Sequence, residues 1–551
     1  MTPSERLEFD FSTAVEALDH HARTTPDRVA VHYGETGQDT TYAELARTTD
    51  LIAGNLADRG LRPGAKVSVL TTQPLVATLA MFGAWKAGCL YAPINFQYTQ
   101  DLLAYQLNDT DPDLLVVDVG LLPAVQAVHA ALEQVPPTVV VGGEGPDTWD
   151  SLLAESTRPD VVVEWDMPAN IIYTSGTTGP SKGVVQLHRW VNQYCWLGRR
   201  MLTPDDVVYN DLPMYHVGGA HFNVTRAIWS GASVSLWDRF SPHDFWRRIR
   251  GTGCTAAVLL DVMIPWLLGS EPSDDDRANP LNKVHMQPLP ATHHEFAVRF
   301  GIDFVTSGFG QSEGGNPLAA VFEQLPEGEG TPPELYRGRN HAQVHALVEA
   351  FDLVLVRGDE EVPKGIMGRE LPHMEVTVRD TTDDECPPGQ VGELCMRPRS
   401  PGVLFHEYLA KPAATVQAWR NLWFHTGDAA FADADGIFYY VDRLGDRIRV
   451  RGENISSFHV EELLAKHESV QLAAVVSVPS AVGDEDEIVA FIEMAEGHSF
   501  DANSLRSHCE STMPKFMRPR DVIVLEQIPR TPTNKIEKYK LRKQFLEGTP
   551  S

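Results

Sequence analysis

Cysteine pairs and long apolar runs are missing from this chain of 551 residues. None of the six cysteines forms a Cys-x-x-Cys pair, so neither a disulfide framework nor a zinc site is expected. The cysteines are Cys89, Cys195, Cys254, Cys386, Cys395 and Cys509. No stretch approaches the ~20 apolar residues of a membrane span, and the first residues lack the apolar core of an export signal. We therefore expect reduced thiols, no membrane partner and a cytoplasmic location.

Positive charge is also in short supply. The formal net charge is −29, with 46 Lys and Arg against 75 Asp and Glu. A field of this sign repels polyanions, so nucleic acid and anionic membranes are not expected partners. If the ligand is itself an anion, local basic residues must overcome that field.

Strands and helices alternate through the first two-thirds of the sequence. Helical spacing over Thr41–Gly60 and Leu79–Gly88 predicts helices, and short apolar runs predict buried strands. The predicted strands are Val67–Leu70, Leu114–Val117, Thr138–Val141 and Ile171–Tyr173. Such alternation predicts an α/β fold with mostly parallel sheets flanked by helices, and the length predicts more than one domain.

The pattern changes after about Gly365. Short alternating segments between Pro/Gly turns predict a small barrel-like sheet, and the last ~105 residues predict a small α+β domain. The barrel strands are Met374–Val378, Gly392–Met396 and Gly436–Val441; the C-terminal elements are helices at His459–His467 and Ala502–Ser511 and strands at Leu472–Val478, Ile488–Met494 and Asp521–Leu525. Gly445 lets the backbone turn freely, so we place the domain boundary there, giving units 1–443 and 444–551.

One loop has the composition of a phosphate site. The strand Ile171–Tyr173 leads into Thr174-Ser-Gly-Thr-Thr-Gly-Pro-Ser-Lys-Gly183. Backbone N–H groups, hydroxyls and one lysine are what a polyphosphate needs. The residues on either side of Lys182 do not match the G-x-x-x-x-G-K-[ST] phosphate loop. A flexible surface loop has a similar composition, so composition alone does not identify a phosphate site.

The full string, together with further segments in order, resembles the adenylate-forming superfamily of acyl-CoA synthetases, peptide-synthetase adenylation domains and luciferases. The other segments are Leu212–Gly219, Gly308–Glu313, Phe424–Asp428, Asp442–Ile455 and Pro529–Ile536. This resemblance implies a large N-terminal domain of two parallel-sheet α/β subdomains plus a small β-barrel. It also implies a small mobile C-terminal α+β domain carrying a catalytic lysine.

The resemblance assigns the ATP site residue by residue. Glu313 would ligate Mg²⁺, Ser312 would reach the α-phosphate, and Lys535 would be the catalytic lysine between the reacting groups. The β- and γ-phosphates would be held by Thr174, Ser175, Gly176, Thr177, Thr178 and Lys182. Adenine and ribose would be held by Gly308, Phe309, Gly310, Gln311, Asp428 and Arg443.

The acyl and thiol sites have weaker support. His216 resembles an acyl-side gate with a catalytic role, and the acyl pocket would comprise His216, Val217, Gly218, Gly219 and Gly308. No Asp stands within Tyr215–Phe222 to pair with an α-ammonium, which disfavours an amino-acid substrate. The coenzyme A contacts would be Arg451, Gly452 and Lys515.

Several segments look closest to crotonobetaine/carnitine–CoA ligases. They are Phe245-Trp-Arg-Arg-Ile, Val441-Asp-Arg443 and Arg451-Gly-Glu-Asn454. The leading interpretation is a ligase that joins a small carboxylic acid to coenzyme A using ATP and Mg²⁺. An enzyme that only adenylates, or that loads a carrier protein, is the alternative, and a non-catalytic binding module is a third.

Two segments depart from the family pattern. Val284–Pro288 lacks the usual Gly-Gly-Ala-Pro of the adenine wall, and Pro332–Arg357 looks like an insertion. Its apolar run Ala342–Leu355 is compatible with a helix near the mouth of the active site, because long loops are often lids.

Overall fold

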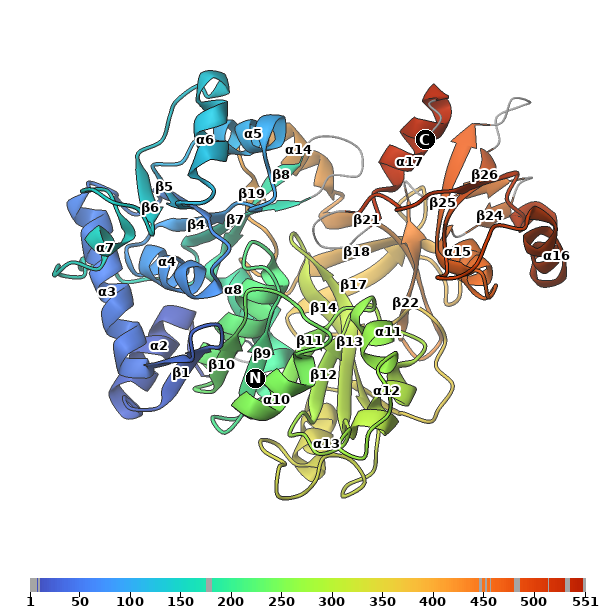
Figure 1. Ribbon diagram of the computed structural model, residues 1–551, viewed down its shortest axis with the longest axis horizontal. Coiled ribbons are helices and arrows are strands. Elements are labelled where there is room, and N and C mark those ends of the chain that lie inside the picture. Colours follow the sequence, from blue (N-terminus) through green and yellow to red (C-terminus); the bar gives the residue numbers. More distant parts are fainter. Residues whose placement is uncertain are drawn as a thin grey trace.

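The structure is a computed structural model (Figure 1). It describes residues 7, 10–174, 181–444, 448–450, 453–455, 457–479, 486–513, 515–530 and 536–548. Two large sheets and a C-terminal unit make up the described chain, which confirms the expected α/β class. No described helix is long and apolar enough to cross a membrane.

The first sheet has seven strands in the order β19-β8-β7-β4-β3-β5-β6. Its members are β3 Lys66–Leu70, β4 Leu90–Pro93, β5 Leu114–Asp118, β6 Thr138–Val141, β7 Pro168–Thr174, β8 Lys182–Leu187 and β19 Glu407–Tyr408. The strands from β7 to β6 are parallel, whereas β8 and β19 add antiparallel pairs at one edge. Strand β5, which lies between β3 and β6, is buried at every position, which explains its continuous apolar sequence.

The second sheet has fifteen strands and joins a parallel part to an antiparallel part. The parallel part runs through β1 Val29–Tyr33, β10 Ser233–Leu236, β9 Val207–Asn210, β11 Ala256–Leu259, β12 Lys283–Met286 and β13 Phe304–Gln311, with β2 Gln38–Thr41 at its edge. The antiparallel part comprises β14 Gly315–Glu323, β16 Ile366–Glu370, β17 Met374–Arg379, β18 Gly392–Pro398, β21 Trp423–Ala432 and β22 Phe438–Arg443, with β15 Val354–Arg357 on β14 and β20 Trp419–Arg420 on β21.

The antiparallel strands expected after Gly365 are present and are continuous with this second sheet. Strand β16 pairs with β14 at Leu318 and Ala319. Gly368 has φ +88°, and a Cβ there would lie 2.0 Å from the carbonyl oxygen of Ala319. Only glycine therefore permits the close approach that joins the two parts.

Helices cover both sheets. They are α2 Ala14–Thr24, α3 Tyr42–Asp58, α4 Pro74–Lys86, α5 Gln100–Thr110, α6 Leu122–Val128, α7 Trp149–Leu152, α8 His188–Arg200, α9 Arg226–Trp229, α10 Phe245–Thr252, α11 Met263–Leu268, α12 His293–Phe300, α13 His341–Ala350 and α14 Pro412–Ala418, with short turns η1 His129–Ala131 and η2 Gly218–Thr225. Helix α3 begins at a capping box in which Thr41 Oγ1 accepts from Glu44 N at 3.2 Å and Glu44 accepts from Thr41 N at 2.8 Å.

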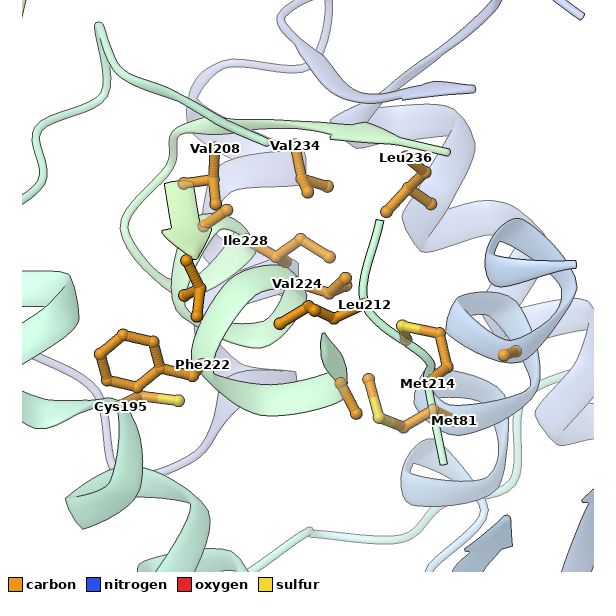
Figure 2. Packing of buried hydrophobic residues seen from close by; sticks show 14 of the residues in the cluster. Met81, Cys195, Val208, Leu212, Met214, Phe222, Val224, Ile228, Val234 and Leu236 are labelled. Carbon is orange, nitrogen blue, oxygen red and sulfur yellow. The ribbon is translucent and has the colours of Figure 1, made fainter. Parts of the chain in front are cut away.

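The main core extends over both sheets, and part of it lies where α8 and η2 meet the second sheet. Figure 2 shows Phe222 and Cys195 packed side by side, with Val224 and Ile228 facing Val234 of β10. The segment η2 is a π-helical turn, a form that is rare and often marks functional sites. It leads directly into α9, so η2 and α9 pack on the same side of this core.

The C-terminal unit has cores of its own, on the two faces of a three-stranded sheet. Its elements are the hairpin β23 Ile448–Val450 and β24 Glu453–Ile455, the sheet β25 Val470–Pro479, β26 Asp486–Met494 and β27 Asp521–Val524, the helices α15 Ser457–Ala465, α16 Ala502–Thr512 and α17 Lys538–Glu547, and the turn η3 Lys515–Met517. In Figure 1 the C-terminal unit lies at one side of the molecule, with α15 and α16 on one face of its sheet and α17 on the other. The boundary at residue 444 stays a prediction.

The segment 332–357 forms the expected helix, α13, but its last residues add strand β15 to β14. His341 at the start of α13 hydrogen-bonds Glu323 at 2.7 Å and Asp303 at 3.1 Å. Glu323 and Asp303 lie at the end of the β13–β14 pair that is remote from Gly308. The helix therefore does not lie beside the predicted nucleotide motif.

Candidate active site

The two ends of the predicted phosphate loop are held by strand pairing. Thr174 ends β7, Lys182 begins β8, and the two are register partners. Tyr105 donates a hydrogen bond of 2.7 Å to the carbonyl oxygen of Ser181, and Tyr173 donates one of 2.9 Å to Asp109. Ser175, Gly176, Thr177 and Thr178 lie outside the described residues. Both ends of the loop are thus fixed by the pairing of β7 with β8.

Tyr408 connects Lys182 to Glu313. The Lys182 ammonium lies 4.8 Å from the centre of the Tyr408 ring, within cation–π range. The Tyr408 hydroxyl donates a hydrogen bond of 2.9 Å to Glu313 Oε1. Burial and the neighbouring Glu313 carboxylate raise the pKa of Tyr408, which keeps the hydroxyl a donor. The predicted phosphate lysine and the predicted metal carboxylate are therefore brought together by a residue that the sequence analysis missed.

Gln311 connects the adenine motif to the ribose motif. Its Nε2 donates to Asp428 Oδ2 at 2.6 Å and to the carbonyl oxygen of Thr426 at 3.1 Å. Asp428 is 3% exposed, and its backbone pairs with that of Arg443 across β21 and β22. The Oε1 atom of Gln311 is buried and has no hydrogen-bond partner in the described structure. A donor group of a bound ligand would satisfy it.

The remaining residues of Gly308–Glu313 line the β13–β14 turn. A Cβ on Gly308 would lie 2.2 Å from the carbonyl oxygen of Leu318, so this position requires glycine, whereas one on Gly310 would meet the end of the Asn316 side chain at 2.6 Å. Phe309 is 7% exposed and packs among the apolar residues of the antiparallel sheet. The carbonyl oxygen of Ser312 accepts a 2.8 Å hydrogen bond from Gln186. Stacking of Phe309 on adenine and contact of Ser312 with phosphate stay predictions.

The Leu212–Gly219 segment forms the bend between β9 and η2. The rings of His216 and Tyr215 pack 4.6 Å apart. A Cβ on Gly219 would lie 2.6 Å from the carbonyl oxygen of Pro213, so this glycine serves a close backbone approach. Val217 is partly buried and packs against the main core, while Gly218 begins η2.

A pocket lies between α8, η2 and strands β11 to β14, with about 550 Å³ of empty space that includes some open solvent. Gly308 lines this pocket, as predicted for the acyl site, whereas His216, Val217, Gly218 and Gly219 are not among its lining residues. Side chains that the sequence analysis did not select line the rest. They include Phe222, Arg226, Lys283, His285, Ser307 and Leu318. The acyl role of the His216 segment stays a prediction.

Lys535, Arg451 and Gly452 lie outside the described residues, and of Arg443 only the backbone is described. The residues on either side of the Lys535 segment are placed: Arg530 and Ile536 form a β-bridge. Burial raises the pKa of Tyr98, with a further contribution from the charge of Glu537, so the end of this segment lies near the N-terminal unit. Lys515 is exposed in η3.

The fold and these connected motifs define an ATP-using enzyme of the adenylate-forming type. The sequence matches the AMP-binding enzyme family over residues 18–409 and the AMP-binding enzyme C-terminal domain over residues 459–535. The chain therefore belongs to the AMP-binding enzyme family, which confirms the resemblance stated above.

The similarity to known proteins extends over nearly the whole chain. A crotonobetaine/carnitine–CoA ligase of Salmonella arizonae is 28% identical, with 92% of this chain and 93% of that protein covered. The ATP-bound structure of MatB from Rhodopseudomonas palustris has a TM-score of 0.80 at 23% identity, covering 97% of this chain and 99% of that one. The anthranilate CoA ligase AuaEII in complex with anthranoyl-AMP also has a TM-score of 0.80, at 21% identity, with 98% of each chain covered. These structures share the fold.

Proposed function

We propose that this enzyme activates a small, non-amino-acid carboxylic acid with ATP, releasing pyrophosphate, and transfers the acyl group of the acyl-AMP to the thiol of coenzyme A. The observation that carries the proposal is the joining of distant motifs: Gln311 holds Asp428, and Tyr408 joins Glu313 to Lys182. CoA ligation is the activity named for relatives that cover nine-tenths of the chain. The six cysteines are free, which supports the proposed cytoplasmic location.

Each connected group has a part in adenylation. Asp428, fixed by Gln311, would accept hydrogen bonds from the ribose hydroxyls, and Lys182 would balance phosphate charge. Glu313 offers carboxylate oxygen beside the phosphate loop, which suits a hard divalent cation such as Mg²⁺. Mg²⁺, when bound, neutralises charge on the phosphate oxygens. Because the attacking carboxylate and ATP are both anions, alignment and charge neutralisation are the main catalytic tasks.

Lys535 would stabilise the negative charge that develops between the carboxylate and the α-phosphate. We expect Lys535→Ala to reduce acyl-AMP formation by at least ~10²–10³, the usual effect of losing one positioned donor. Thioester formation from preformed acyl-AMP should be spared, because the lysine acts only in the first half-reaction. Lys543→Ala is the matched control, since that side chain is 70% exposed in the same C-terminal segment. Equal losses in both half-reactions would remove the special role of Lys535.

The test of the whole proposal is carboxylate-dependent exchange of pyrophosphate into ATP across a panel of acids, followed by detection of thioester with coenzyme A. Exchange together with thioester is the expected result. Exchange without thioester would favour adenylation alone or the loading of a carrier-protein phosphopantetheine. No exchange with any acid would contradict adenylation.

A further inference from the structure

Arg226 is a buried cation that shares the charge of one buried carboxylate, Asp206, with Lys283. It is 4% exposed and lines the pocket that Gly308 also lines. Its guanidinium lies 4.5 Å from the centre of the Phe222 ring, and one nitrogen contacts Asn223 Oδ1 at 3.5 Å. The Nε atom has no hydrogen-bond partner, and no ion pair of Arg226 is found in the described part of the chain. Burial lowers the pKa of Arg226 to about 10, which leaves it charged at neutral pH.

The second cation of the pocket, Lys283, has its charge balanced by a buried carboxylate. Lys283 Nζ lies 2.8 Å from the carboxylate of Asp206, a residue whose side chain is completely buried. Burying a charge without such a partner is costly, and proteins rarely retain one. Because Asp206 is already paired with Lys283, the charge of Arg226 is only partly compensated, which points to a partner that arrives with the ligand.

Two further polar groups lie on the same walls. Ser307 Oγ is buried and has no hydrogen-bond partner in the described structure. Burial, helped by the charge of Arg226, lowers the pKa of His285 to about 4, so this imidazole is neutral near pH 7. Its ring nitrogens lie 3.0 Å from Thr306 Oγ1 and 3.1 Å from Gln287 Oε1. Arg226 thus supplies positive charge that is only partly compensated, and Ser307, which lines the same pocket, offers a hydroxyl.

We propose that the acid substrate is a dicarboxylic acid, whose second carboxylate binds Arg226 and Ser307 while the first reacts at the Gly308 end of the pocket. The inference rests on the proposed function, because it assigns this pocket to the acyl group. An acid with an apolar tail leaves the guanidinium unpaired, and an acid with a fixed positive charge adds repulsion in a desolvated site. Both classes are therefore disfavoured.

Pyrophosphate exchange with matched acids tests this subsite. Glutarate, adipate and phthalate are compared with pentanoate, hexanoate and benzoate, and with carnitine as the cationic acid. At least one dicarboxylate should exceed its monocarboxylate partner and carnitine in kcat/KM. In Arg226→Met the ratio of dicarboxylate to monocarboxylate turnover should fall about 10- to 100-fold, the usual effect of losing a hydrogen bond to a charged group. Arg226→Lys should recover part of it.

Arg248→Met is the control, since Arg248 is 7% exposed and donates to the carbonyl oxygen of Arg239 at 2.8 Å away from the pocket lining. Its dicarboxylate preference should equal that of the unchanged protein. Calorimetric binding of the best dicarboxylate, without ATP, gives a readout that does not need catalysis. Preference for a monocarboxylate or carnitine, or equal losses for both acids in Arg226→Met, would overturn the proposal. Dicarboxylate binding without exchange would keep the subsite and contradict adenylation instead.

Discussion

The β13–β14 hairpin separates two regions that differ in how their buried polar side chains are paired. At its turn, on the nucleotide side, the charged site groups are already bonded, Asp428 to Gln311 and Glu313 to Tyr408, although Gln311 Oε1 is a buried atom there without a partner in the described structure. Along its strands, on the acyl side, Arg226 and Ser307 face a pocket with hydrogen-bonding capacity unused.

This difference separates two tasks of a ligase. Groups that hold one another in place need little reorganisation when ATP binds, which favours a fixed geometry for a constant substrate. Unpaired buried groups penalise every ligand that fails to satisfy them, so they create selectivity among acids. Substitutions on the nucleotide side should therefore reduce turnover by the same factor with every acid. Substitutions on the acyl side should reduce turnover with some acids and not with others.

The largest effect is expected at Asp428. Replacing it by alanine removes the predicted acceptor for the ribose hydroxyls and releases Gln311. We expect kcat/KM for ATP in pyrophosphate exchange to fall by about 10²–10³, because two hydrogen bonds to a charged group are lost. The same factor should appear with every acid of the panel. Asp435→Ala, at an exposed position in the turn between β21 and β22, is the control. A loss that depends strongly on the acid would break the proposed division between the two regions.

An intermediate effect is expected at Tyr408. Tyr408→Phe keeps the ring beneath Lys182 and removes the hydroxyl that donates to Glu313. We expect the Mg²⁺ concentration for half-maximal exchange to rise about 10-fold, the lower range for loss of a group that orients a metal ligand. Tyr439→Phe is a matched control, because Tyr439 donates to Asp433 at 3.0 Å and is similarly buried. An unchanged Mg²⁺ dependence in Tyr408→Phe would separate Glu313 from the metal.

Local sequence patterns predicted the parallel framework well. The strand expected at Thr138–Val141 has these bounds in the structure, and Leu114–Val117 ends one residue short of β5. Continuous β-branched and apolar runs identify such strands because both faces are covered. The charged residues after Lys535, where no helix was predicted, form α17. Its burial depends on Leu541 and Phe545, one turn apart, and two apolar residues give too weak a helical period.

Site residues could be predicted only where they belong to sequence motifs that follow one another in a fixed order along the chain. The strings around Gly308 and Asp428 identified the nucleotide side. Tyr408 and Arg226 had no such signal, because neither residue type nor spacing records which tertiary neighbours a side chain meets. The lid role expected of 332–357 stays a prediction, and the carbonyl oxygen of Arg337 in this segment accepts a 3.2 Å hydrogen bond from Lys283 of the pocket. His341 fixes α13 to Glu323 and Asp303, at the opposite end of β13 from Gly308.

The smallest effect on turnover is expected at that histidine, whose ring packs on Phe304 of the pocket but which does not itself line the pocket. Burial alone lowers the pKa of His341, but Asp303 and Glu323 outweigh it, so the pKa is raised above 6.5. A histidine whose pKa is higher in the folded than in the unfolded protein stabilises the fold, and this stabilisation is complete at pH values below the unfolded pKa. It is lost as the pH rises through the folded pKa. His341→Gln should therefore lower the free energy of unfolding by about 1–3 kcal/mol below pH 6.5. The loss should shrink at higher pH, and exchange activity should be unchanged.

His345→Gln tests the same contact at an exposed position. His345 lies 3.0 Å from Glu323 but is 46% exposed, so its loss should cost at most about 1 kcal/mol. Denaturant unfolding of both variants at pH 5.5 and pH 8 gives the comparison. If His341→Gln instead altered pyrophosphate exchange while leaving stability intact, polar pairing at this end of β13 would be coupled to the pocket. The division between a fixed nucleotide side and a selective acyl side would then have to include the α13 segment.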